Sequence, residues 1–166
     1  MPVGENVTQE MCEKFKEFLK DSYADYVKNR CRATLRCLII SLYETAKVVY
    51  TFNNDINKGK PNYKYVKQSM PNSMYVVQLE TLRDNLAHNY HKVKDVVVAV
   101  YDCLTLFDKD KTTHIAVTCG LPVSLYDDII GFCTAYIRRT SGNTPVQGNT
   151  SGFMSGIING INPNRR

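Results

Sequence analysis

The chain has 166 residues, of which 43% are apolar, and a formal net charge of +5, so it is long enough for one domain with a core that needs neither disulfides nor metals. The surplus of positive charge is compatible with an anionic partner but does not require one, because clustering of charge matters more than the total. No apolar run reaches the roughly 18 residues of a membrane span and none resembles a signal peptide, so we expect a cytoplasmic protein that does not bind membranes.

Six cysteines are spread along the chain without a C-x-x-C pair or the clustered spacing of a zinc site. Without a secretion signal, we interpret them as reduced and mostly buried small hydrophobic residues. They are Cys12, Cys31, Cys37, Cys103, Cys119 and Cys133. We therefore expect no bound metal, and no cofactor is indicated.

Apolar residues recur at three- and four-residue steps over residues 8–28, which predicts a helix with Thr8 as its N-cap. The same period continues to about residue 52. Residues 8–52 therefore form either two helices divided by a bend near Asn29 or one continuous helical stretch. Residues 53–73 contain Asn, Lys, Gly and Pro with little periodicity and predict a long loop. Loops of that length in small domains are usually functional or mobile.

An apolar helical stripe returns at residues 74–87, and Asp95 is placed to cap a following helix that reaches residue 107. One unbroken helix over 74–107 is the alternative. A turn is expected over 108–113, a short strand or extended link over 114–119, and a last helix from Pro122 to about Ser141. Residues 143–166 are rich in Gly, Asn and Ser and predict a flexible tail after a helical domain of residues 1–142, unless their apolar residues dock on a partner or a second subunit.

These elements predict an all-α fold, an antiparallel bundle of four to five helices, because short polar turns favour antiparallel neighbours. The periodicity also predicts the residues of the core. They are Leu35, Leu38, Ile39, Leu42, Leu79, Leu82, Val96, Val100, Ile129 and Cys133.

The segment R-D-N-L-A-H-N-Y, residues 83–90, combines groups suited to phosphate chemistry at the end of a predicted helix. Arg83 offers a permanent cation with a planar donor fork, and His88 can exchange a proton near neutral pH. Asp84 lies one turn before His88 and is placed to orient its ring, while Tyr90 lies two turns after Arg83 on nearly the same face. Arg83 and His88 are roughly 140° apart on a helix, so they converge only if the arginine curls, the helix ends, or a second copy contributes.

This segment resembles the R-x4-H-x-Y motif of the HEPN superfamily, in which Asn, Asp or His commonly follows the arginine, as Asp84 does here. HEPN domains are small and all-helical, and many are metal-independent ribonucleases of toxin–antitoxin and antiviral defence systems. The resemblance implies a HEPN-like fold, catalytic roles for Arg83 and His88, and supporting roles for Asp84, Asn85 and Tyr90. It also implies a homodimer, and a cognate antitoxin or a nucleotidyltransferase that modifies Tyr90.

The implied chemistry is cleavage of RNA by attack of its own 2′-hydroxyl, with His88 as general base or acid and Arg83 stabilising the charge on phosphorus. Two alternatives remain: a non-catalytic HEPN-like domain that binds a nucleotide or a partner, and a structural adaptor bundle in which the motif is a coincidence.

The long loop offers a weaker RNA-binding candidate because its cations alternate with aromatic residues, a combination that suits single strands. The residues are Lys58, Lys60, Tyr63, Lys64, Tyr65 and Lys67.

Overall fold

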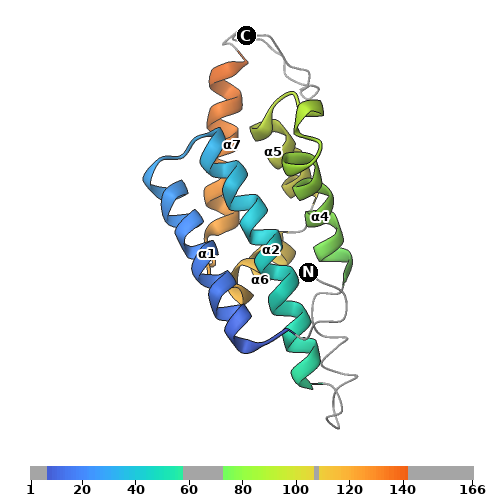
Figure 1. The fold of residues 1–166 in the computed structure, drawn as a ribbon. Helices are drawn as coiled ribbons and strands as arrows, with labels where there is room; N and C mark the ends of the chain where they lie inside the picture. Colours follow the sequence, from blue (N-terminus) through green and yellow to red (C-terminus); the bar gives the residue numbers. More distant parts are fainter. Residues whose placement is uncertain (1–6, 58–72, 107–108, 142–166) are drawn as a thin grey trace. The chain divides into compact units, whose positions relative to one another are not determined.

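The computed structural model describes residues 7–57, 73–106 and 109–141. Within these ranges the chain forms six α-helices, one 3-10 helix and no strand (Figure 1), which confirms the predicted all-α helical bundle, with one helix more than the upper estimate. The chain divides into two compact units, residues 1–126 and 127–166, which are described separately. None of the helices in the described ranges is long and apolar enough to cross a membrane.

The first unit begins with helices α1 (Gln9–Lys28) and α2 (Arg32–Asn57), which pack side by side and antiparallel (Figure 1). The Thr8 hydroxyl accepts the Met11 N–H at 3.1 Å and so caps α1 as predicted. Extended backbone at Asn29 (φ −149°, ψ 92°) ends α1, so the bend does divide the two stretches. Helix α2 continues to Asn57, which corrects the prediction that the loop starts at residue 53.

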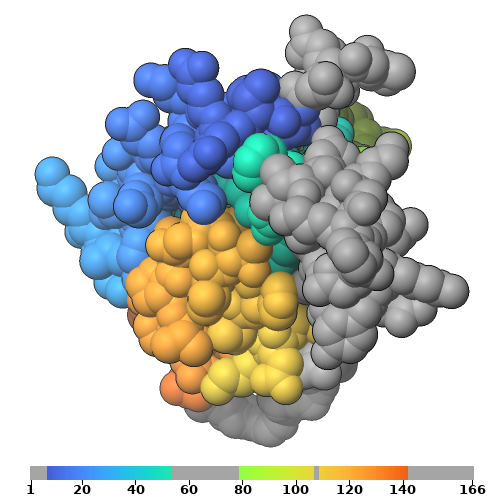
Figure 2. Space-filling model, turned by 90° about the horizontal axis from the view of Figure 1, so that it is seen from below, coloured from blue at the N-terminus to red at the C-terminus, as the bar shows by residue number. Residues whose placement is uncertain are grey.

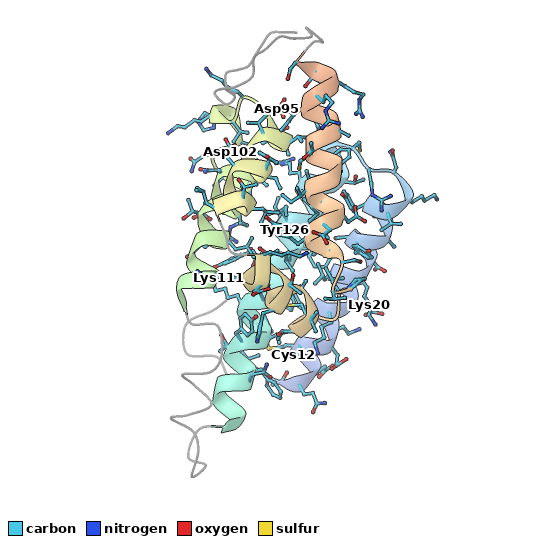
Figure 3. All side chains as sticks on the ribbon, turned by 180° about the vertical axis from the view of Figure 1, so that it is seen from behind. Cys12, Lys20, Asp95, Asp102, Lys111 and Tyr126 are labelled. Atoms are coloured by element: carbon cyan, nitrogen blue, oxygen red, sulfur yellow. The ribbon has the colours of Figure 1, made fainter. Side chains whose placement is uncertain are left out.

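Helices α4 (Ser73–Ala87) and α5 (Val96–Leu106) are separated by the short 3-10 helix η1 (Tyr90–Lys92), so one unbroken helix over 74–107 is wrong. The Asp95 carboxylate accepts the N–H groups of Val97 at 2.8 Å and Val98 at 3.2 Å. Asp95 therefore caps α5 as predicted, and Figure 3 places it at the start of that helix.

Helix α6 (Lys109–Thr118) occupies the segment for which a turn and a short strand were expected. It ends in a Schellman motif, in which the Leu121 N–H bonds to the Ala116 carbonyl and the Gly120 N–H bonds to the Val117 carbonyl. Gly120 has φ +95°, a value that side chains with a Cβ rarely adopt, so glycine suits this position.

All ten predicted core residues are at most 3% exposed. Helix α2 is central to the first unit because it packs against α1, α4, α5 and α6. At one end, Val7, Cys12, Val48 and Val49 form an apolar cluster. Figure 2 views the molecule from this end, where α1, the last turns of α2 and α6 appear together.

Helix α7 (Leu125–Thr140), of which all but the first two residues belong to the second unit, begins three residues after Pro122 and ends before Ser141, close to the predicted bounds. Acidic residues in its first turn and arginines in its last turn complement the helix dipole. The predicted tail, residues 143–166, lies outside the described residues.

All six cysteines are free thiols, as expected. Cys12, Cys119 and Cys133 are buried, whereas Cys37 is exposed. Burial raises the pKa of Cys119 to about 12, which keeps this thiol protonated at neutral pH.

Candidate functional site

The candidate site forms where α2 and α4 run antiparallel (Figure 1). Near the start of α2, the Arg36 Nε donates to the Leu86 carbonyl at 2.7 Å, near the end of α4. About two turns further along α2, Glu44 pairs with Arg83. The helix pair therefore aligns the predicted motif with residues of α2 that lie 39 or more positions earlier in the chain.

Arg83 is held from three sides. Its Nη1 donates to the Glu44 carboxylate and its Nε donates to Asp84 Oδ1 at 2.8 Å. Its guanidinium carbon lies 4.4 Å from the centre of the Tyr43 ring, a cation–π distance. The Arg83 side chain is only 13% exposed. Burial lowers the Arg83 pKa, but the hydrogen bond to Asp84 and the charge of Glu44 outweigh it, and the pKa is raised overall.

Tyr43 lies beneath this guanidinium and is almost fully buried. Burial, followed by the charge and the hydrogen bond of Glu80, raises the pKa of Tyr43 to about 12. The phenol is therefore neutral at physiological pH, and it presents Arg83 with an aromatic face rather than a third anion.

Asp84 does not have the role that the helical spacing predicted. Its carboxylate is bound to Arg83, and its contact with His88 is a backbone one, in which the His88 N–H donates to the Asp84 carbonyl at 2.8 Å. The predicted orientation of the imidazole by Asp84 is therefore corrected: Asp84 positions Arg83 instead. Asn85 is exposed on α4.

His88 follows the last residue of α4, and its side chain is exposed. Within the described part of the chain, its ring has no hydrogen-bond or ion-pair partner. A ring so placed is accessible to a solvent proton and to a ligand.

Tyr90 does not lie on the Arg83 face of a continuous helix, because α4 ends at Ala87 and Tyr90 starts η1. Its ring lies instead under Arg36, whose guanidinium carbon is 3.9 Å from the ring centre. Tyr90 is 43% exposed. The expected position of Tyr90 on nearly the same helix face as Arg83 is therefore wrong, and its ring contacts Arg36.

Sequence reasoning missed Arg36, Tyr43 and Glu44 as parts of the site. In the sequence Arg36 is one of several cations near the start of α2, and no local spacing links it to Tyr90, 54 residues later. Only the packing of α2 on α4 brings these groups to the motif.

The other histidines of the chain have different surroundings. The Nδ1 atom of His114 lies 3.2 Å from both the Tyr50 and the Thr118 hydroxyl oxygens, which indicates a structural role. His91 is exposed in η1.

The predicted RNA-binding loop residues Lys58, Lys60, Tyr63, Lys64, Tyr65 and Lys67 lie outside the described residues. Across the described ranges, no group of three or more His, Cys, Asp or Glu side chains is placed to hold a metal ion.

Comparison with known proteins does not identify a family: no family model, curated protein or solved structure matches the chain.

Proposed function

We propose that the chain is a metal-independent endoribonuclease of the HEPN type, acting in a toxin–antitoxin or antiviral defence system. The observation that supports this most is the setting of His88, an exposed residue that lies in sequence between Leu86 and Tyr90, the two residues that Arg36 contacts. A proton-transfer group and a cation that can bind phosphate are thereby linked in one small region.

In this reaction the 2′-oxygen attacks the neighbouring phosphorus while neutral His88 accepts the 2′-hydroxyl proton. The bond between phosphorus and the 5′-oxygen breaks, and water protonates the departing oxygen. The products are a 2′,3′-cyclic phosphate and a 5′-hydroxyl. DNA lacks the attacking hydroxyl and is not cleaved.

Asp84 and Glu44 fix the orientation of Arg83. Two of its N–H donors are engaged by those carboxylates, whose combined charge exceeds its own, so the role of Arg83 in this proposal is to position the end of α4, which His88 follows.

A second candidate is a non-catalytic helical domain that binds a nucleotide or protein partner. The enclosure of Arg83 by Glu44, Asp84 and Tyr43 favours it, because such an arginine also serves simply to join α2 to α4. Under this alternative the wild-type protein does not cleave RNA, so no variant changes cleavage. Arg83→Ala then only weakens folding.

The test is incubation of purified protein with RNA in EDTA. We expect cleavage to cyclic-phosphate ends by the wild type and at least a 100-fold loss in His88→Ala. His91→Ala is the matched control, because His91 is also exposed and lies three residues away, and we expect it to stay within about threefold of wild type. Cleavage that requires a divalent metal, or that persists in His88→Ala, contradicts the proposal.

The proposal extends to the protein's partners and location. RNA is the substrate, a homodimer is the active form, and a cognate antitoxin or nucleotidyltransferase is the regulator, acting on Tyr90 in the cytoplasm. The exposure of the Tyr90 side chain, 43%, is compatible with such a modification.

A further inference from the structure

Two basic segments that are far apart in sequence meet beside His88. Residues 28–36 contain four basic residues and no acidic one, and residues 88–94 contain two lysines, two histidines and no acidic residue. Arg36 joins them through its hydrogen bond to Leu86 and its stacking on Tyr90. Both segments belong to the first unit.

Most of the side chains in these segments are exposed, including Arg32, Lys92 and Lys94. Of the acids that border the region, Asp84 bonds to Arg83, Asp95 caps α5 and Asp25 is exposed. The lysines and arginines of the two segments outnumber these acids, and such a surface attracts a polyanion.

The Arg36–Tyr90 pair has the geometry of a nucleotide platform. The bond from Nε to the Leu86 carbonyl holds the Arg36 guanidinium over the Tyr90 ring. The two terminal nitrogens of Arg36 have no hydrogen-bond partner in the described part of the chain, so they present the donor fork that matches phosphate oxygens. With 43% of Tyr90 exposed, its ring retains surface on which a base can stack.

We infer that Arg36 and Tyr90 form a subsite for single-stranded RNA, in which Arg36 binds a phosphate and Tyr90 stacks on the neighbouring base. This inference rests on the proposed function and adds a substrate-binding site to it. A single strand is required because a base within a duplex does not expose its face to a protein ring. The subsite lies next to His88 in the chain, so it positions the strand for reaction at that residue.

The test measures binding rather than cleavage, in a His88→Ala background that leaves the RNA intact. Affinity for a fluorescent 12-nucleotide oligouridylate is followed by anisotropy over a range of salt concentrations, beside a hairpin duplex of similar length. We expect Tyr90→Leu to weaken binding of the single strand about tenfold, and Tyr90→Phe, which keeps the ring, to stay within about twofold.

Arg36→Gln is expected to weaken binding about tenfold and to reduce the slope of log affinity against log salt by about 0.7, the value for one phosphate contact on a single strand. Lys14→Ala is the control for charge alone, because Lys14 is exposed but lies far from the basic segments. About 20 Å of helix separates it from the end of α1, where the segment 28–36 begins. It should bind within about twofold of the parent. Circular dichroism confirms that each variant is folded before it is compared.

Equal binding by Tyr90→Leu and the parent, tighter binding of the duplex, or no binding of RNA by the parent overturns the subsite. These outcomes are distinct from failure of the proposed function. A protein that binds the single strand through Arg36 and Tyr90 but never cleaves it retains the subsite and loses the nuclease. A protein whose cleavage depends on His88 while binding ignores Tyr90 retains the nuclease and loses the subsite.

Discussion

At Arg83, one guanidinium contacts two carboxylates and an aromatic ring, and these contacts connect the end of α4 to the middle of α2. The partners differ in exposure: the Glu44 side chain is 31% exposed and that of Asp84 is 42% exposed. Solvent therefore screens both pairs in part, and their contribution lies between that of a surface pair and that of a fully buried one.

Replacing Arg83 by alanine is expected to lower the free energy of unfolding by about 2 kcal/mol, because Glu44 loses its partner and the Tyr43 ring loses its cover. Arg83→Lys keeps the charge but not the two-sided fork, and it should recover about half of that loss. Urea denaturation followed by circular dichroism measures both. Unchanged stability in Arg83→Ala would mean that the enclosure of Arg83 does not support the fold.

At the level of helices, the segment whose conformation was predicted wrongly is one in which packing outweighs the local preference of its residues. Helix α6 contains threonines and β-branched residues that disfavour helix, and its polar start resembles a turn. Yet Thr112, Ile115, Ala116 and Cys119 are buried at helical spacing. A threonine in the first of these positions made the stripe hard to recognise, because threonine counts as polar in a search for periodicity.

The core and the caps were predictable for the opposite reason. Leu35, Leu38, Ile39 and Leu42 fall on one face of α2 by their spacing alone, and Thr8 and Asp95 bond to N–H groups two or three residues away. The contacts that join α2 to the motif span 39 to 54 residues and depend on how α2 and α4 are rotated against each other. No local pattern carries that information, so the contact of Tyr90 with Arg36 was missed. Asp84 is a different case, because it bonds to its sequence neighbour Arg83 and not to the residue one turn later.

The cap of α5 can be tested with two aspartates of the same element, both labelled in Figure 3. Asp95→Ala removes the acceptor of two backbone N–H groups and should lower the free energy of unfolding by about 1 kcal/mol, whereas Asp95→Asn keeps an acceptor and should cost under about 0.5 kcal/mol. The control is Asp102, whose pKa is raised by burial, so its charge is not stabilised by a partner. Asp102→Ala is expected to remain within about 0.5 kcal/mol of wild type. A larger loss at Asp102 than at Asp95 in thermal or urea unfolding would contradict the capping role.

On the scale of the whole molecule, the proposed dimer would place two copies of the basic region around His88 on either side of a two-fold axis. Arg32, Arg36, Lys92 and Lys94 would then be repeated in one groove, and like charges would repel across it. RNA would relieve this repulsion by lying between the copies. Salt would relieve it by screening, since the Debye length falls from about 10 Å at 0.1 M to about 3 Å at 1 M.

We therefore expect the dimer to be tighter at 0.5 M salt than at 0.05 M salt, the opposite of a dimer held by opposite charges. Light scattering at micromolar concentration should give twice the 18.9 kDa mass of the chain, with more monomer at low salt. Arg36→Gln, which removes one cation from each copy, should reduce the salt dependence, while Lys14→Ala, away from the basic region, should leave it unchanged. If one site draws on both copies, mixing the inactive His88→Ala protein with the weakly binding Arg36→Gln protein gives more cleavage than the Arg36→Gln protein alone. A monomer at both salt concentrations would exclude the composite site, and activity would then have to arise from the groups of a single chain.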